Sequence, residues 1–451
     1  MYSDSDTIIA PATAVGVGAI SIIRLSGSDA PIFLNRCFTP AKGSSTLTSH
    51  RLTYGFIDDA QGNILDHVMA VYMRAPASFT SEDTVEVHCH ANPYVVKHII
   101  KRFTAMGARF AEPGEFSYRA FMHGRIDLTE AEAIAELIEA GSDTSARIAL
   151  QHLEGSVSAM AETLREHLFQ ILALVEAYLD FPEDEVDNIH INMLNDTVDT
   201  VLTQIDKLIS TFHTGRILRE GLSILILGKP NVGKSSILNY LLGRDRAIVT
   251  EIPGTTRDFI EEHITLGHLP VKLVDTAGLR DSVDIVEQTG VKRALDKIQD
   301  VDLVLFVVDA TENDTLSVDL ADLHLNDTPY LIVVNKSDKV DIDTFTLECE
   351  HICVSAVTGY GMDSLKQQIE SRFTVPESTD SSVITEQRHF NIFAQVKEEV
   401  CAFKAGLDDH LPGEFLACHI RDAMSCLGRI TGETEPEDIL NHIFTKFCVG
   451  K

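Results

Sequence analysis

The chain has 451 residues and a formal net charge of −31, from 68 acidic and 37 basic side chains. This length predicts two to four domains with sizeable cores. So acidic a surface repels nucleic acid, and we expect any contact with RNA to be local or supplied by a basic partner. No apolar run approaches the roughly 18 residues that span a bilayer, and the first residues resemble neither a signal nor a transit peptide. With eight cysteines scattered without framework spacing, we expect a cytoplasmic protein with reduced thiols and no membrane partner.

The first section, residues 1–122, alternates short β-like runs with turns and predicts an α+β domain. One helix-like stretch, Pro93–Met106, interrupts the strands. His88 and His90 share one face of a strand, but without a second paired motif they do not predict a zinc site. The expected strands are Thr7–Ala10, Ala19–Leu25, Leu52–Ile57, His67–Met73 and Val85–His90.

Helical periodicity begins near residue 127 and predicts the first part of an α-helical domain over residues 123–215. Asp127 and Glu130 have the spacing of a capping box. Apolar side chains then recur every three or four residues from Val157 to Tyr178 and again from Leu194 to Phe212. We expect Pro182 to end the first of these two helices.

Residues 216–380 predict an inserted Ras-like P-loop GTPase domain with a mostly parallel sheet. Gly228–Ser235, with the sequence GKPNVGKS, follows an apolar strand-like run and precedes a helix. Backbone N–H groups, the positive helix end and Lys234 together make a phosphate cradle, and Ser235 would bind Mg²⁺. Asn231 offers an oxygen where a monovalent cation could sit, although an ordinary turn residue fits the same position.

Three further motifs, each ending an apolar strand-like run, identify the nucleotide as GTP. Asp275–Gly278 supplies an aspartate that reaches Mg²⁺ through water and a glycine that meets the γ-phosphate. Asn335–Asp338 supplies a carboxylate that can accept two hydrogen bonds from the N1 and N2 edge of guanine. Ser355 and Ala356 fit a backbone contact to the base oxygen.

The region between these motifs indicates an unusual hydrolysis mechanism. We expect Thr256, within Gly254–Asp258, to complete the Mg²⁺ shell. Ras-type GTPases orient the attacking water with a glutamine directly after the second motif. Leu279 occupies this position and cannot do so. The residues alone leave three carboxylates as candidates for this role: Asp281, Asp284 and Glu287.

Helical stripes return over residues 381–451 and predict the second part of the helical domain, so that both flanks of the GTPase segment build one helical frame. Apolar stripes run from Phe393 to Leu407 and from Leu416 to Leu427. Thr434 with Glu437 is expected to cap the last helix. The terminal motif contains Cys448, which fits either a buried residue in a frayed tail or a thiol carried on a flexible tail into a partner's active site.

Several segments together resemble the tRNA-modification GTPase family over essentially the whole length. That family works with a flavoprotein on wobble uridines and forms 5-carboxymethylaminomethyluridine. The resemblance implies a GTP-hydrolysing subunit that forms a homodimer, joins the flavoprotein in a heterotetramer and contacts tRNA mainly through that partner. The segments are Ile22–Gly27, Glu112–Ser117, Leu128–Ile134, Gly228–Ser235, Gly254–Asp258 and Phe447–Lys451.

The resemblance also implies cofactors and their contacts. A reduced folate of the 5,10-methylene- or 5-formyl-tetrahydrofolate type would serve as one-carbon donor. Arg125 stands where the family often has lysine, which keeps the charge and changes the hydrogen-bond geometry. K⁺ would promote pairing of two GTPase domains and replace an arginine finger. The implied folate contacts are Arg24, Glu82, Arg125 and Lys451, and the implied K⁺ ligands are Asn231, Thr250, Ile252 and Thr255.

Two catalytic roles follow from the same resemblance. Glu287 would orient the water that attacks GTP, and Cys448 would act in the modification step. The expected nucleotide contacts are Asn231, Val232, Gly233, Lys234, Ser235, Ser236, Thr250, Glu251, Ile252, Pro253, Gly254, Thr255, Thr256, Asp275, Thr276, Ala277, Gly278, Asn335, Lys336, Asp338, Ser355 and Ala356.

The main alternative is a ribosome-assembly or regulatory GTPase that acts only as a binding switch. It would share every GTP motif but lack the folate-like N-terminal section and the terminal thiol. A mechanical scaffold GTPase is a second alternative, and the absence of basic membrane-binding stretches in the sequence counts against it.

Overall fold

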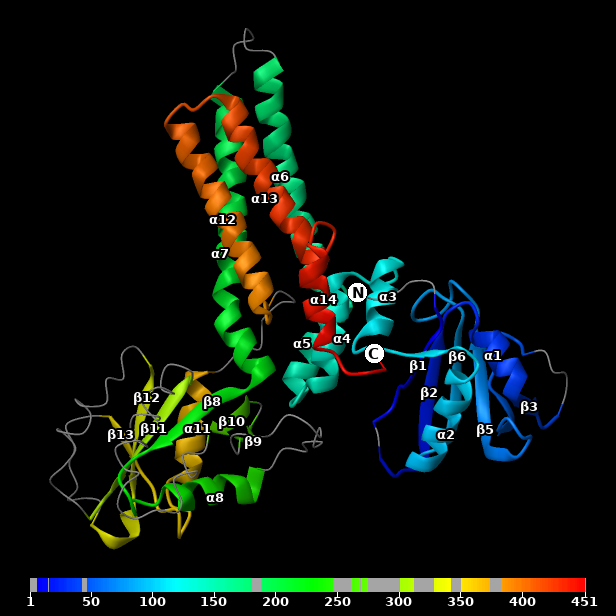
Figure 1. Cartoon of the computed structure of the whole chain (residues 1–451). Helices are drawn as coiled ribbons and strands as arrows, with labels where there is room; N and C mark the ends of the chain where they lie inside the picture. Colours follow the sequence, from blue (N-terminus) through cyan, green and yellow to red (C-terminus); the bar gives the residue numbers. More distant parts are fainter. Residues whose placement is uncertain are drawn as a thin grey trace. The chain divides into compact units, whose positions relative to one another are not determined.

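The computed structural model divides the chain into two compact units, residues 1–135 with 424–451 and residues 136–423. Figure 1 shows the elements of both. The structure describes residues 6–14, 16–42, 47–180, 188–245, 261–267, 269–274, 301–311, 328–341, 350–373 and 383–450. Within these ranges, no helix combines the length and the apolar character needed to cross a membrane.

The first unit contains a seven-stranded sheet in the order β3-β4-β5-β6-β2-β1-β7. Its neighbouring strands are antiparallel except for the parallel pair β1 and β7. All five expected strands are present, and the short strands β3 and β7 were missed because two or three residues show no periodicity. The strands are β1 Ile8–Pro11, β2 Ile20–Ser26, β3 Phe38–Pro40, β4 Thr53–Asp58, β5 Ile64–Met73, β6 Thr84–His90 and β7 Arg109–Phe110.

Alternating side chains give this sheet one apolar face, which packs against two helices. Val85, Val87 and Cys89 of β6 are buried together with Phe103 of α2 (Pro93–Thr104) and side chains of α1 (Ala30–Cys37). This is the period of two that a half-buried strand requires. Helix α2 begins after Asn92, whose side chain accepts a hydrogen bond from the Tyr94 amide at 2.8 Å, as an N-cap residue does.

A smaller apolar cluster holds the end of the chain to this unit. Helices α3 (Glu115–Met122), α4 (Leu128–Glu139) and α14 (Glu437–Thr445) meet around Phe444, which is fully buried. The ring of Phe444 packs edge-on against Tyr118, with centroids 5.4 Å apart, and against Phe447 at 5.3 Å. The last residues of the chain are therefore packed on α3.

One of the two expected helix caps is confirmed and the other is wrong. The Asp127 amide donates to Glu130 Oε2 at 2.8 Å and the Glu130 amide donates to Asp127 Oδ1 at 2.9 Å, which is a capping box. Helix α14, however, begins after Pro436 without a side-chain cap. The Thr434 hydroxyl instead donates to the Ser425 carbonyl at 2.9 Å, because the turn folds back on the preceding helix.

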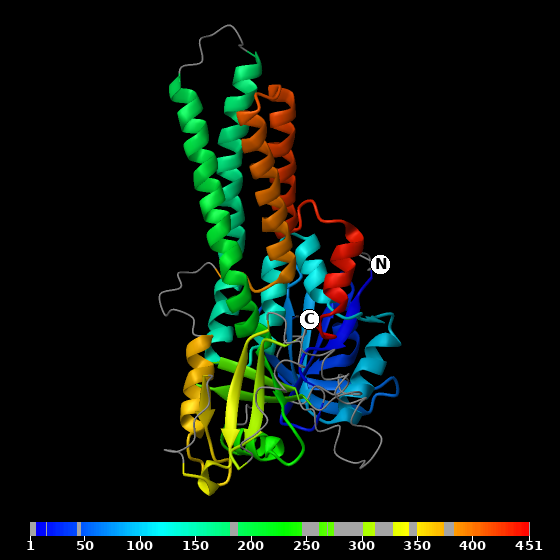
Figure 2. The same cartoon turned by 90° about the vertical axis from the view of Figure 1, so that its left-hand side faces the viewer.

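The second unit contains a group of long helices that lie side by side in Figures 1 and 2. Helix α6 ends at Asp180, two residues before Pro182, and α12 packs along α7. Helices that precede and follow the GTPase motifs in sequence are therefore neighbours in space. The long helices are α6 Ser156–Asp180, α7 Asn188–Glu220, α12 Gln387–Asp408 and α13 Gly413–Thr431, of which the part up to Ala423 belongs to this unit. The shorter helix α5, Asp143–Leu153, precedes them in sequence.

The remaining part of this unit is a six-stranded sheet in the order β13-β12-β11-β8-β10-β9, in which only β9 is antiparallel. The carboxyl ends of the parallel strands share one edge, where ligands bind in open α/β sheets. Its elements are β8 Leu222–Leu227, α8 Lys234–Asp245, β9 Glu261–Leu266, β10 Leu269–Val274, β11 Leu303–Asp309, β12 Tyr330–Asn335, the 3₁₀ turn Ser337–Lys339, β13 His351–Cys353 and α11 Met362–Arg372.

Candidate functional site

The loop between β8 and α8 has a backbone conformation that requires glycine at two positions and suits asparagine at a third. Gly228 has φ of +147°, and a Cβ there would lie 2.2 Å from the Val307 carbonyl oxygen. Gly233 has φ of +101°, and a Cβ would lie 2.0 Å from Asn335 Nδ2. Asn231 has φ of +64°, a left-handed conformation that asparagine tolerates. These positions close the loop tightly before the N-terminus of α8, the geometry of an anion site.

Lys234 and Ser235 open α8 directly after this loop. Lys234 Nζ donates to the carbonyls of Gly228 at 2.8 Å and Lys229 at 2.7 Å. Burial lowers the pKa of this ammonium below its ordinary value. Ser235 is exposed at the helix start, where its hydroxyl fits a Mg²⁺ ligand beside bound phosphates. The narrow loop and this hydroxyl together fit a nucleotide–Mg²⁺ complex.

Asn335, at the end of β12, connects the second half of the site to the phosphate loop. Its Nδ2 donates to the Val232 carbonyl at 2.8 Å, and its Oδ1 accepts from the Ala356 amide at 3.2 Å. The side chain is buried. One amide thus holds three expected nucleotide-binding segments together: the phosphate loop, the Asn335 motif and the Ser355 motif.

Lys336 has a partner that the sequence reasoning missed. Its Nζ donates to the Asn231 carbonyl at 2.8 Å and forms an ion pair with Asp309, the last residue of β11. Burial alone would raise the pKa of Asp309, but hydrogen bonds from Lys336 and Thr311 hold it below its usual value. The available signal was that Asp309 ends an apolar run, as each recognised motif does.

Asp338 and Ser355 form the part of the site expected to meet the base. Ser355 Oγ donates to Asp338 Oδ1 at 2.6 Å, and its amide donates to the Tyr360 carbonyl at 2.9 Å. Ser355 is fully buried whereas Asp338 is exposed. The carboxylate is therefore oriented from behind while its outer face is open to a ligand.

The other expected nucleotide, cation and catalytic residues of the GTPase domain lie outside the described residues. Their assignment stays a prediction. They are Thr250, Glu251, Ile252, Pro253, Gly254, Thr255, Thr256, Asp275, Thr276, Ala277, Gly278 and Glu287, and the alternatives Asp281 and Asp284.

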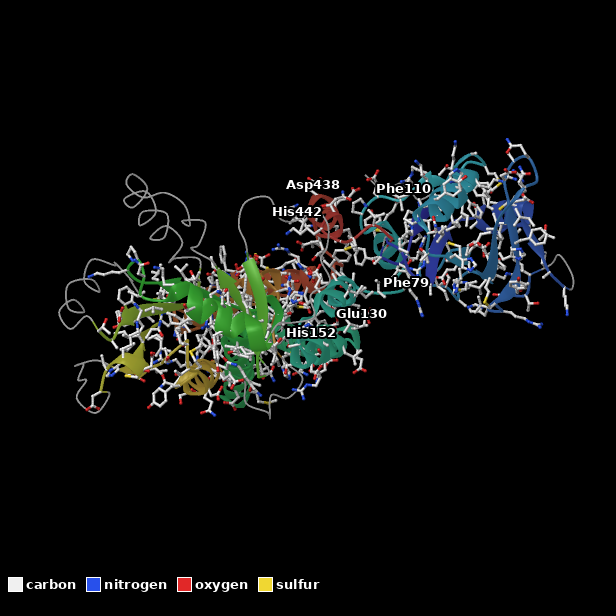
Figure 3. All side chains as sticks on the ribbon, turned by 90° about the horizontal axis from the view of Figure 1, so that it is seen from below. Phe79, Phe110, Glu130, His152, Asp438 and His442 are labelled. Carbon is white, nitrogen blue, oxygen red and sulfur yellow. The ribbon has the colours of Figure 1, made fainter. Side chains whose placement is uncertain are left out.

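In the first unit, Glu82 of the loop before β6 contacts β2, the strand that carries Arg24. Arg24 and Ser26 share a face of β2, and Ser26 Oγ donates to Glu82 Oε2 at 2.7 Å. Arg24 pairs with Glu86 at 2.9 Å and lies 5.5 Å from the ring centroid of Phe79, which Figure 3 labels. A carboxylate, a guanidinium and an aromatic ring are suitable contacts for a flat, charged heterocycle.

A buried arginine, also missed by the sequence reasoning, fixes Glu82. Arg119 of α3 is 1% exposed and its Nη1 donates to both Glu82 oxygens at 3.2 Å. Its Nη2 contacts Asp6 at 2.7 Å and Glu115 at 3.1 Å. Burial would lower the pKa of Arg119, but these carboxylates raise it. Glu82 is therefore held from the protein side by a permanent cation.

Of the two remaining implied folate contacts, Arg125 and Lys451, the structure describes only Arg125. Arg125 is exposed, and its amide closes the turn after α3 by donating to the Ala120 carbonyl at 2.8 Å. Lys451 lies outside the described residues. Within the described ranges, no three or more His, Cys, Asp or Glu side chains are grouped to hold a metal ion, His88 and His90 included.

The described part of the terminal motif is packed and Cys448 is exposed, so neither the buried cysteine in a frayed tail nor the flexible tail is correct, whereas an accessible thiol is. The Gly114 amide donates to the Cys448 carbonyl at 3.3 Å. Gly450 has φ of +96°, and a Cβ there would lie 2.0 Å from the Pro11 carbonyl oxygen. The backbone on both sides of Cys448 is thus fixed while its thiol side chain is accessible.

A glycine-bounded phosphate loop and an Asn-Lys-x-Asp motif at the carboxyl edge of a parallel sheet define a P-loop GTPase domain, here combined with an α+β domain and long helices. The family described as MnmE helical domain matches residues 128–448. The family described as GTP-binding protein TrmE N-terminus matches residues 7–125. The chain belongs to the tRNA modification GTPases of this family, which favours the tRNA-modification hypothesis over a switch without chemistry.

Relatives match along the whole chain. A tRNA modification GTPase MnmE of Syntrophotalea carbinolica is 44% identical, covering 99% of this chain and 100% of the relative. One of Geobacter sulfurreducens is 42% identical and covers both chains completely. The G domain of the T. maritima FeoB iron transporter is 25% identical over 34% of this chain and 99% of that chain, with a TM-score of 0.27.

Proposed function

We propose that this chain hydrolyses GTP to drive modification of wobble uridines in tRNA, adding a carboxymethylaminomethyl group at C5 together with a flavoprotein partner. Family membership supports GTP hydrolysis in tRNA modification. The single observation that supports the folate-dependent modification step is that α3 contacts both the expected folate site and the terminal segment. This helix holds Glu82 through Arg119 and the Cys448 backbone through Gly114, so an expected folate contact and the terminal thiol depend on one element.

In this proposal the GTPase domain positions GTP with residues of the phosphate loop, the base-binding motifs and the segments between them. The amides of the phosphate loop and Lys234 bind the phosphates, and Ser235 with Thr256 holds Mg²⁺, which neutralises phosphate charge. Asp338 accepts hydrogen bonds from guanine, and Asn335 keeps the base-binding and phosphate-binding loops in register. Glu287 orients the attacking water in place of the glutamine that Leu279 replaces.

The proposal includes a bound K⁺ and pairing of two GTPase domains. Asn231 is exposed and its backbone is in the left-handed region, so its side chain is available as an oxygen ligand at the phosphate loop. Thr250, Ile252 and Thr255 would complete the ion's shell. The ion supplies the charge that an arginine finger supplies in other GTPases, a contribution of roughly 10³–10⁵ in rate.

The first unit would bind the reduced folate and form the homodimer. Arg24, Glu82, Arg125 and Lys451 are the proposed folate contacts, and Cys448 acts in the modification step. The division into domains 1–122, 123–215, 216–380 and 381–451 is part of this proposal.

Reconstitution with the flavoprotein, a reduced folate, GTP and unmodified tRNA tests the proposed function. Mass analysis of wobble nucleosides should show the C5 adduct only when GTP and this chain are both present. Replacement of Glu82 by Gln should weaken folate binding in a calorimetric titration without changing GTP turnover. A chain that hydrolyses GTP but neither binds folate nor supports modification would contradict the proposal.

A further inference from the structure

A cluster of buried and partly buried polar side chains lies in the second unit, away from the nucleotide site. It joins Glu136 of α4, His152 of α5, Arg219 of α7 and the segment Val383–Glu386 that precedes α12, and we call it the junction cluster. Figure 3 labels His152 among these helices. Glu136, His152 and Thr385 are 7%, 3% and 2% exposed, so their charges and hydroxyl must be satisfied within the protein.

Glu136 is the centre of the junction cluster. Its Oε1 accepts from Thr385 Oγ1 at 2.6 Å and lies 3.5 Å from Arg219 Nε, and its Oε2 lies 3.1 Å from His152 Nδ1. Burial alone would raise the pKa of Glu136, but His152, Thr385 and Arg219 hold it below its ordinary value. The carboxyl is therefore an anion and can only accept hydrogen bonds.

The other contacts of His152 and Arg219 connect Glu136 to the segment before α12. His152 Nε2 lies 2.9 Å from the Val383 carbonyl oxygen, which is also only an acceptor. The ring of His152 therefore connects Glu136 of α4 to Val383, in the segment before α12. Arg219 Nη1 contacts Glu386 Oε2 at 2.8 Å and the Thr385 carbonyl at 3.3 Å.

The junction cluster lies where the chain enters and leaves the GTPase domain. Helix α7 leads through Gly221 into β8, and the described chain resumes after that domain at Val383. The two connections touch: the Ile384 amide donates to Thr211 Oγ1 at 3.1 Å, and a Cβ on Gly215 would lie 2.2 Å from the Ile384 carbonyl oxygen. A shift of one connection must therefore move the other.

The last turn of α7 is also fixed to the sheet that carries the phosphate loop. Arg216, one turn before Arg219, pairs with Asp302 at the start of β11, and the Ser223 amide of β8 donates to Asp302 Oδ2 at 2.9 Å. Next to the junction cluster is a cavity of about 260 Å³, which is lined by Glu136, Arg219 and Thr385. Lys272 of β10 also lines this cavity, so the cluster lies close to that strand. Strand β10 ends at Val274, directly before the Asp275 motif.

A charged network is an unusual way to stabilise this junction, because well-packed apolar residues of similar volume would stabilise it equally or better. The charge-assisted hydrogen bonds of the junction cluster are directional, so displacement of one element would break its contacts with the others. We propose that Arg216 and Arg219, through Asp302 and Glu136, are positioning residues that transmit nucleotide-dependent movement of the β8–β10–β11 sheet to α12. The consequence for uridine modification rests on the proposed function.

The experiment compares Thr385→Val and Glu136→Gln with the matched control Glu139→Gln, in the full-length protein with its partner. Glu139 lies one turn along α4, is exposed and lines the same cavity. We expect both cluster variants to keep GTP turnover within about twofold and to lower modified tRNA per GTP hydrolysed by about 2- to 30-fold. Thr385→Val keeps the side-chain volume and removes one hydrogen bond to the buried Glu136 carboxylate, so its melting temperature should fall by only a few degrees and the variant should stay folded in the assay.

A second readout does not need the modification reaction. Amide hydrogen exchange of the α12 start is measured with GDP and with a non-hydrolysable GTP analogue. We expect a nucleotide-dependent difference in the wild type and in Glu139→Gln, and its loss in Thr385→Val. The inference would be overturned if the nucleotide-dependent exchange difference and the amount of modified tRNA per GTP hydrolysed both equalled those of Glu139→Gln. It would also be overturned if GTP turnover, modification and melting temperature all fell together. Wild-type protein without modification activity would refute the proposed function instead, and the exchange result would still decide this inference.

Discussion

Replacing Asp309 by Asn tests whether the ion pair with Lys336 contributes to guanine nucleotide binding. Asp309 is 6% exposed and Lys336 is 26% exposed, so water screens the pair only in part. Asp309 Oδ1 accepts from the Thr311 amide at 3.0 Å and from its hydroxyl at 2.8 Å, whereas Oδ2 contacts Lys336. An amide can keep the first oxygen while presenting an NH₂ group to the ammonium.

The magnitude follows from the type of contact. A hydrogen bond to a charged group contributes about 1.5–3 kcal/mol, which corresponds to about 10- to 150-fold in an equilibrium constant. Lys336 is also held by the Asn231 carbonyl at 2.8 Å, so we expect the lower half of this range. Loss of the pair leaves Lys336 with the Asn231 contact alone, so the link between the base motif and the phosphate loop weakens and nucleotide affinity should fall accordingly.

Titration of a fluorescent guanine nucleotide at neutral pH measures the effect, with Thr311→Val as the control that loses one hydroxyl and leaves the ion pair intact. The folded-state pKa of Asp309 is lowered, so its contribution is present above the ordinary carboxyl pKa of about 3.9. This contribution is lost only as the pH falls through the pKa that Asp309 has in the folded protein, which is lower than the ordinary value. Wild-type affinity should therefore be constant across neutral pH. An Asp309→Asn affinity within twofold of wild type would refute the reasoning.

Five further outcomes are expected. GTP turnover should be rapid in K⁺ and near basal in Na⁺ at equal ionic strength, and equal rates would remove the cation from the mechanism. Glu287→Ala should slow hydrolysis with nearly unchanged GTP affinity, and a collapse of affinity would give Glu287 a structural role. Phe444→Ala should cost about 3–5 kcal/mol and, in limited proteolysis, release the terminal segment; an uncut tail would contradict this. Cys448→Ser should abolish modification with normal GTP turnover. In thiol labelling, Cys448 should react before Cys37, whose pKa burial raises to about 12.

The phosphate loop and the Asn335 motif could be predicted from sequence because their geometry is local. A glycine-bounded turn between a strand and a helix determines where Lys234 and Ser235 lie, whatever surrounds them. The contacts between motifs could not be predicted. Asp309 meets Lys336 because β11 and β12 pair in parallel with Asp309 opposite Asn335, and a single sequence does not show that register.

The N-terminal site shows the same limit. Glu82 was expected from the resemblance, but its partner Arg119 is 37 residues away on a helix whose docking depends on the whole core. The Thr434 cap was wrong for a local reason: Pro436 precedes the helix and the threonine hydroxyl bonds to Ser425 instead. A spacing rule fails when the intervening chain folds back on an earlier element.

Gly215 shows why the link between the helices and the GTPase domain is hard to read from sequence. A glycine inside an exposed helix costs about 1 kcal/mol relative to alanine, yet α7 continues through it to Glu220 without a break. The backbone of Ile384, 169 residues later in sequence, occupies the space that a Cβ would need. The glycine therefore permits a contact between two connections and does not end the helix. Since Arg216 and Arg219 follow on the next turn, the proposed division between residues 215 and 216 falls within α7, the helix that joins the two parts.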